Sequence, residues 1–119
     1  MAGKPGEKLP NGDKAVIPQA KLEGYLLSES HVVGRTKARF FRSLGYTIAN
    51  SSQLKEKLKT IAQRGQIVAA TETDFGIKYE VRGDLSRQGQ SVSITTVWIV
   101  EKGSSHPRLV TAYPTKGKD

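Results

Sequence analysis

The sequence predicts an α+β fold in which about three N-terminal helices pack on one face of a mostly antiparallel sheet of about four strands. Apolar residues recur at helical spacing as far as Gly65, whereas from Gln66 onward they alternate with polar residues, as in strands with one buried face. The chain has 119 residues, of which 36% are hydrophobic, and this suits a single compact domain with its own core.

Three segments carry the helical pattern. The first helix is expected at 18–28, where a proline suits the first helical position and large apolar residues follow at helical spacing. The second is expected to begin at Gly34 and to end at Gly45, which can adopt the left-handed conformation of a C-terminal cap. The third follows N-cap candidates at 50–52 and has one apolar stripe that ends at Gly65.

Four later segments are expected to form the strands: 66–71, 77–82, 91–101 and 108–114. Turn-forming residues separate them, and the short connections favour antiparallel pairing. The domain is expected to span 15–114. Residues 1–14 are rich in glycine, proline and charge and are expected to form a flexible leader, and 115–119 are expected to form a flexible tail.

Charge gives the first indication of function. The chain has 19 Lys and Arg residues against 11 Asp and Glu, a net charge of +8 with a pI near 9.9. The excess lies in the first half and at the C-terminus, because residues 66–101 hold five acidic and three basic side chains. A small basic domain attracts polyanions, so RNA, DNA and an acidic protein are the first candidate partners.

Several function classes lack support in the sequence. There is no cysteine, and two histidines with dispersed acids form no recognisable metal site, so we expect neither a metal nor another cofactor. Nucleotide-binding glycine motifs and the nucleophile elbow of hydrolases are also missing. No apolar run is long enough to cross a bilayer or to act as a secretion signal, so we expect a cytoplasmic protein without a membrane partner.

The second helix carries the most informative side chains. At about 100° per residue, Lys37 falls within the apolar arc, where it must either extend its ammonium to solvent or lie beside an anion. Arg35, Arg39 and Arg42 form a basic stripe on the other side. With the lysines of the third helix they make a surface broad enough to follow a phosphate backbone, although an exposed basic stripe is also common without any ligand.

Two further groups of residues are candidates. His31 precedes the basic helix, and its imidazole could act as a general acid or base near Lys37, or it could simply form loop hydrogen bonds. His106 is interpreted as a turn residue. In the last two strands, Thr96 and Trp98 share one face, as do Thr111 and Tyr113, and if the two pairs adjoin they form a patch able to hold a phosphate or a base.

The ordered series AVIPQAKLEGYLL, GRTKARFFRSLGY, FGIKYEV, TTVWIV and PRLVTAYP resembles a bacterial domain family without a firmly assigned activity. Its members occur as small free-standing proteins and as C-terminal domains of polymorphic and contact-dependent inhibition toxins. The resemblance implies the barnase, EndoU, colicin and RelE-like ribonuclease fold group, and a small acidic neutralising protein as partner. It places the family's motif residues on His31, Gly34, Lys37, Ala38, Arg39, Thr96, Trp98, Thr111 and Tyr113.

We therefore expect a metal-independent endoribonuclease of toxin type that cleaves transfer or messenger RNA by attack of the 2′-hydroxyl. The expected catalytic residues are His31, Lys37, Arg39, Thr111 and Tyr113, and the expected substrate-binding residues are Arg35, Arg42, Thr96 and Trp98. The alternative is a non-catalytic basic domain that binds RNA or an acidic partner, and a third possibility is an inactive toxin relative retained for interaction.

Overall fold

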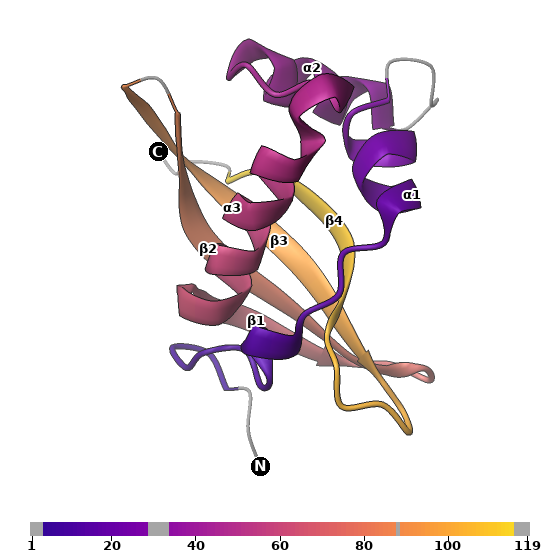
Figure 1. The fold of residues 1–119 in the computed structure, drawn as a ribbon. Helices are drawn as coiled ribbons and strands as arrows, with labels where there is room; N and C mark the ends of the chain where they lie inside the picture. The colour runs from indigo at the N-terminus through magenta and orange to yellow at the C-terminus, as the bar shows by residue number, and fades with distance from the viewer. Residues whose placement is uncertain (1–3, 29–33, 88, 116–119) are drawn as a thin grey trace.

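A computed structural model describes residues 4–28, 34–87 and 89–115. Along these residues the helices precede the strands, and the three helices lie over a four-stranded antiparallel sheet (Figure 1). The predicted α+β class and the order of its elements are therefore confirmed. His31 lies outside the described residues, and so does the side chain of Arg35.

The helices begin and end close to the predicted residues. Helix α1 (Gln19–Lys21) continues directly into a π-helical turn at Leu22–Leu26, and together they form the short first helix. Helices α2 (Gly34–Ser43) and α3 (Ser51–Arg64) follow. Single 3-10 turns lie at Gly12–Lys14 and Ile48–Asn50.

Local interactions explain where α2 ends and α3 begins. Gly45 has a φ of 95°, and its N–H donates to the Arg42 carbonyl at 2.9 Å, so this glycine ends the helix as predicted. Asn50 precedes α3, but its side chain accepts from the Thr47 N–H at 2.7 Å and donates to the Gly45 carbonyl, not to α3. The Ser51 hydroxyl donates to Glu23 and ties α3 to the first helix.

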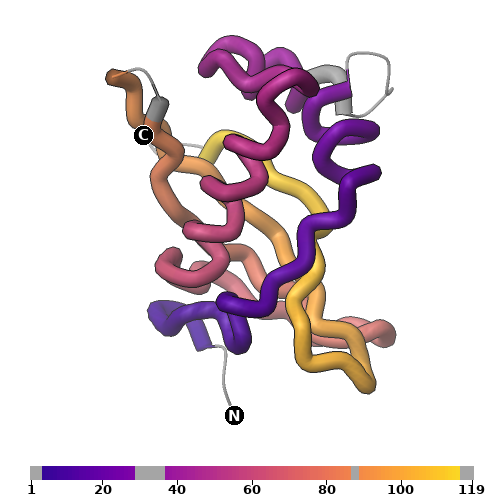
Figure 2. The backbone as a smooth tube through the Cα atoms, in the orientation of Figure 1, coloured from indigo at the N-terminus to yellow at the C-terminus, as the bar shows by residue number. Residues whose placement is uncertain are grey.

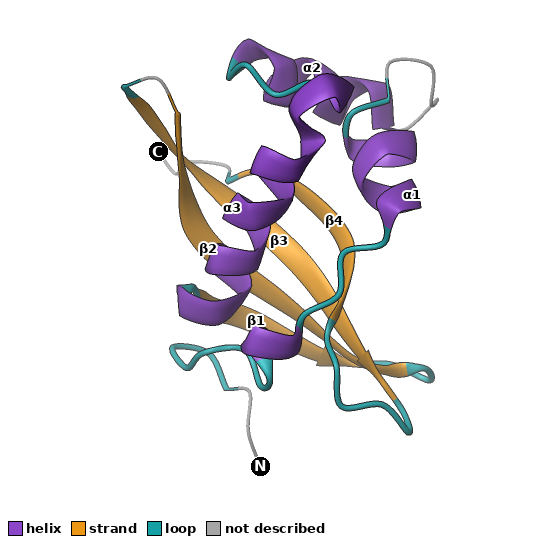
Figure 3. Cartoon of the chain, in the orientation of Figure 1, coloured by secondary structure: helices purple, strands orange, loops and turns teal. Residues whose placement is uncertain are grey.

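The strands are β1 (Gln66–Glu72), β2 (Gly76–Arg87), β3 (Gln90–Glu101) and β4 (Arg108–Pro114), and they pair in that order. All three pairings are antiparallel. The helices lie in front of the sheet in Figure 3. The inward side chains of the strands belong to the same buried cluster as those of the helices. The core on this face includes Tyr79, Val81, Leu85, Ile94, Trp98, Leu109 and Ala112. We call the opposite side of the sheet the open face.

The N-terminal segment packs on the domain, which differs from the predicted flexible leader. The Gly6 N–H donates to the Ile67 carbonyl at 2.7 Å, and the Ile67 N–H donates to the Glu7 carbonyl at 2.8 Å. Leu9 is 4% exposed and Gly12 is buried against α3. The glycines and prolines that suggested disorder here form tight turns between points of contact. The chain then runs along the outer edge of β4 towards α1, as Figure 2 shows.

Candidate functional site

Four side chains from three elements meet beside the edge strand β4. The phenol oxygen of Tyr25, on the π-helical turn, lies 3.2 Å from the Thr111 hydroxyl oxygen on β4. The Lys21 ammonium lies 5.0 Å from the centroid of the Tyr25 ring, and the Lys37 ammonium of α2 lies 5.7 Å from it. All four side chains are half-buried. We call Lys21, Tyr25, Lys37 and Thr111 the Tyr25 cluster.

Two local irregularities build this cluster. A π-helical turn carries Tyr25, and such turns shift the following side chains relative to a regular helix. On β4, Leu109 pairs with Trp98 while Thr111 pairs with Val97, so Val110 is an extra residue. This β-bulge turns Thr111 outward while Leu109 stays in the core.

The cluster answers the question that the sequence left open about Lys37. Its ammonium lies over the face of an aromatic ring, where a cation–π interaction partly compensates its desolvation. Within the described part of the chain, neither Lys21 nor Lys37 has an ion-pair partner. The Tyr25 ring therefore lies near two ammonium groups, and its phenol contacts a second hydroxyl group. Ammonium and hydroxyl groups are also the groups that bind anions.

Tyr113 lies next to this cluster on the open face. It pairs with Thr95 on β3, which pairs in turn with Arg82 on β2. Burial raises the pKa of the Tyr113 phenol, the Glu80 carboxylate raises it further, and the Arg82 guanidinium lowers it. The strand register places Tyr113 on the same face as Arg82, Glu80 and Thr111.

The other predicted α2 residues are separate from the Tyr25 cluster. Ala38 and Phe41 are fully buried under α2, while Arg39 and Arg42 are exposed. Because Arg39 lies about 200° around the helix from Lys37, its side chain leaves from the other side. The structure therefore brings together Lys37 and Thr111, with Tyr113 beside them, but not Arg39.

The prediction that Thr96 and Trp98 bind substrate is wrong. Both side chains are 0% exposed and lie on the helix-covered face, opposite to that of Thr111 and Tyr113. The Trp98 indole N–H donates to the Thr96 hydroxyl at 2.7 Å, and that hydroxyl donates to the Val81 carbonyl at 2.9 Å. The alternation was predicted correctly, but the two pairs belong to different faces, so Thr96 and Trp98 form a structural pair inside the core.

Sequence reasoning missed Lys21 and Tyr25 as site residues. Tyr25 was assigned to the apolar face of the first helix, since an aromatic residue at helical spacing is most often part of the core. Lys21 and Tyr25 are four residues apart, a spacing that brings side chains together on a helix, and this was the available signal.

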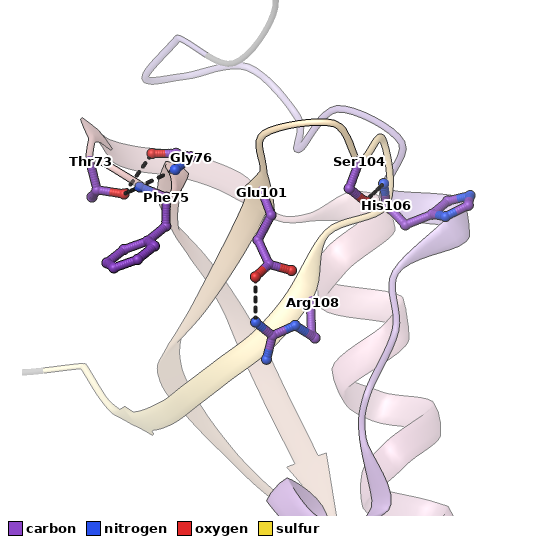
Figure 4. A network of polar contacts seen from close by, with 7 residues as sticks. All are labelled: Thr73, Phe75, Gly76, Glu101, Ser104, His106 and Arg108. Atoms are coloured by element: carbon purple, nitrogen blue, oxygen red, sulfur yellow. Dashed lines mark hydrogen bonds and ion pairs between the residues drawn. The ribbon is translucent and has the colours of Figure 1, made fainter.

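A second surface lies at the far end of the sheet, at the turn between β1 and β2. Phe75 is 74% exposed there. The Thr73 hydroxyl accepts from the N–H groups of Phe75 and Gly76, each at 3.1 Å, and the Lys102 N–H donates to the Phe75 carbonyl. Figure 4 shows the ring projecting from this turn near the ion pair of Arg108 and Glu101, whose atoms are 3.1 Å apart.

His106 lies at the same end, in the turn before β4. The side chain is exposed, and the backbone N–H donates to the Ser104 hydroxyl at 3.2 Å (Figure 4). This agrees with its interpretation as a turn residue. Across the described ranges, no three His, Asp or Glu side chains gather in a metal-ligand arrangement. No helix in those ranges is long and apolar enough to span a membrane.

Comparison with known proteins assigns the chain to a family. It belongs to the family described as "Domain of unknown function (DUF6883)", whose profile matches residues 8–116. Among curated proteins, none matches significantly. Among solved structures, the fold is similar to a chain of a contact-dependent growth inhibition toxin–immunity protein complex from Klebsiella pneumoniae 342. That similarity has a TM-score of 0.66 and 20% identity and covers 85% of this chain and 100% of the other. The likeness shows a shared fold.

Proposed function

We propose that this member of the DUF6883 family is a metal-independent endoribonuclease of toxin type, with the Tyr25 cluster as part of its catalytic site. The observation that carries the proposal is the position of two ammonium groups over the ring of Tyr25, whose phenol forms a hydrogen bond with the Thr111 hydroxyl. Positive charges and hydroxyl donors are the groups that a phosphodiester needs when it gains negative charge in a transition state.

In the proposed reaction the 2′-hydroxyl of the substrate loses its proton to a base and its oxygen bonds to phosphorus. The bond from phosphorus to the 5′-oxygen breaks, and that oxygen takes up a proton. The products are a 2′,3′-cyclic phosphate and a free 5′-hydroxyl. We assign His31 as a general acid or base, as its place before α2 in the sequence suggests.

The remaining residues bind and stabilise. Lys37 neutralises the charge that develops on the phosphoryl oxygens, and Lys21 adds a second positive charge beside it. Thr111 and Tyr113 donate hydrogen bonds to the phosphate or hold a base. Arg39 is exposed on the other side of α2, so we reassign it from catalysis. It joins Arg35 and Arg42, which were predicted to bind substrate, in contacts with the RNA backbone away from the reacting phosphate.

The toxin setting rests on two observations that point the same way. The sequence resembles C-terminal toxin domains, and a structurally similar chain belongs to a toxin–immunity protein complex. We propose on this basis that a small acidic protein neutralises this chain. The net charge of +8 favours association with such a partner as well as with RNA.

Single-turnover cleavage of RNA in EDTA tests the catalytic assignment. We expect Lys37→Ala and Thr111→Val each to lower the cleavage rate, about 100-fold or more for Lys37→Ala, as for the loss of one transition-state donor. Lys102→Ala removes the same charge from the exposed turn after β3 and is the matched control. Wild-type rates in the Lys37→Ala variant would remove the Tyr25 cluster from the mechanism.

The second candidate is a non-catalytic RNA-binding domain, favoured by the basic charge and by the exposed arginines of α2. A salt titration with intact RNA separates the two functions. A binder loses affinity steadily with salt and leaves the RNA whole, because phosphate contacts release counterions. If the RNA is instead cut into discrete fragments at constant protein concentration, the protein is a nuclease.

A further inference from the structure

A groove of about 490 Å³ lies at the β1 edge of the sheet, away from the Tyr25 cluster. It is bounded by the last turn of α3, the start of β1 and the middle of β2. Its polar lining residues are Thr60, Arg64, Gln66, Arg82, Asp84 and Ser93.

The groove follows from the way that α3 joins the sheet. Strand β1 begins at Gln66, opposite Arg82, so the part of β2 beyond Arg82 has no strand partner on that side. Gly65 and Gly83 let the helix approach closely: a Cβ on Gly83 would lie 2.8 Å from the Ile61 side chain, and one on Gly65 would lie 2.7 Å from the Arg82 carbonyl. The open edge of β2 beyond Arg82 leaves a hollow beside that strand.

The groove carries net positive charge. The side chains of Arg64 and Arg82 are both exposed, and within the described residues neither guanidinium group forms a hydrogen bond or an ion pair. Asp84 is the one acid among the lining residues. Two guanidinium groups facing one hollow suit a phosphate, because each can donate a planar pair of N–H groups to two phosphate oxygens.

A continuous row links this groove to the Tyr25 cluster. Tyr113, Thr95, Arg82 and Gln66 are successive cross-strand partners on the open face, one from each strand from β4 to β1. Thr95 is 3% exposed, so a ligand along the row would contact its neighbours. Adjacent strands are about 4.8 Å apart, so the row is about 15 Å long. At a rise of about 3.4 Å per stacked nucleotide, this corresponds to roughly four nucleotides.

We propose that Arg64 and Arg82 form a phosphate subsite that binds the RNA backbone several nucleotides from the phosphate held at the Tyr25 cluster. This inference rests on the proposed function and deepens it, since it makes the substrate a single strand that crosses the open face. A dinucleotide is too short to occupy both sites, whereas an octanucleotide reaches from one to the other.

The test measures affinity for 2′-O-methyl RNA, which lacks the attacking hydroxyl and stays intact, by fluorescence anisotropy. We expect Arg64→Gln and Arg82→Gln each to weaken octanucleotide binding about tenfold, equivalent to about 1.4 kcal/mol. We also expect each to reduce the slope of log affinity against log salt by about 0.7. Dinucleotide binding stays unchanged in both variants. Lys102→Gln, the matched loss of one charge, leaves octanucleotide affinity within about twofold.

The inference would be overturned by unchanged octanucleotide affinity in both arginine variants, or by an equal loss of affinity in Lys102→Gln. Weaker binding of a polyglutamate peptide with unchanged RNA affinity would assign the groove to an acidic protein and would also overturn it. The outcome is separable from the proposed function. If binding depends on the arginines but natural RNA is not cleaved, the nuclease proposal is wrong and the subsite stands. If both arginine variants cleave RNA with the wild-type KM, the nuclease proposal stands and the subsite is wrong.

Discussion

Replacing Thr96 with valine tests the structural pair inside the core. The Thr96 hydroxyl accepts the Trp98 indole N–H at 2.7 Å and donates to the Val81 carbonyl at 2.9 Å, and both side chains are fully buried. Valine has nearly the same side-chain shape as threonine but no hydroxyl, so the indole N–H loses its acceptor. Because the position is fully buried, no water takes the place of the hydroxyl. An unsatisfied buried donor costs about 1 to 3 kcal/mol and the second lost bond about 1 more, so we expect about 2 to 4 kcal/mol lower unfolding free energy.

Urea unfolding followed by tryptophan fluorescence measures this loss directly, because Trp98 is the single tryptophan of the chain. Thr96→Ser is the matched control: it retains both hydrogen bonds, and we expect it to lose only about 1 kcal/mol with its methyl group. A Thr96→Val protein within about 0.5 kcal/mol of wild type would refute the buried pair. A selective loss of RNA affinity in folded Thr96→Ser would revive the substrate-binding prediction.

Three further predictions address other parts of the molecule. Because the pKa of Tyr113 is raised on folding, the folded state holds this proton more tightly, so stability falls as pH rises above about 10; Tyr113→Phe has a shallower fall in urea unfolding between pH 9 and 11. Gly12→Ala places a Cβ directly against the Ala62 carbonyl and lowers stability by about 1 to 3 kcal/mol. The control Gly24→Ala meets open space and raises stability by about 0.5 to 1 kcal/mol. Equal changes in thermal stability for the two variants would contradict the packing of the N-terminal segment. Phe75→Ser changes the unfolding free energy by less than about 0.5 kcal/mol, because its ring is exposed, and a larger loss would mean that the ring is packed.

The fold could be predicted from the sequence because its local signals agree. The change from helical to alternating periodicity at Gly65 coincides with the end of α3, and Gly45 ends α2 with the positive φ that only glycine adopts readily. The N-terminal segment could not be predicted in this way. Its contacts are backbone hydrogen bonds to Ile67 and close packing at Gly12, both set by partners more than 45 residues away in the sequence.

Part of the candidate site could also be predicted from local sequence patterns. Lys37 stood out because a lysine within an apolar arc needs a partner, and Thr111 and Tyr113 followed from strand alternation. Alternation cannot say which face of a strand the helices cover, so it left open whether Trp98 adjoins Thr111 and Tyr113, and in the structure Trp98 lies in the core. The π-helical turn of Tyr25 and the bulge before Thr111 have no sequence signal of their own, yet they create the contact between them.

The nuclease proposal is tested most sharply by the chemistry of RNA ends after incubation of the purified protein with total bacterial RNA in EDTA. We expect discrete cuts whose fragments carry 2′,3′-cyclic phosphate and 5′-hydroxyl ends, and we expect these cuts to be lost in Lys37→Ala but not in Lys102→Ala. Intact RNA with a folded wild-type protein, or equal cutting by Lys37→Ala, would contradict the proposal.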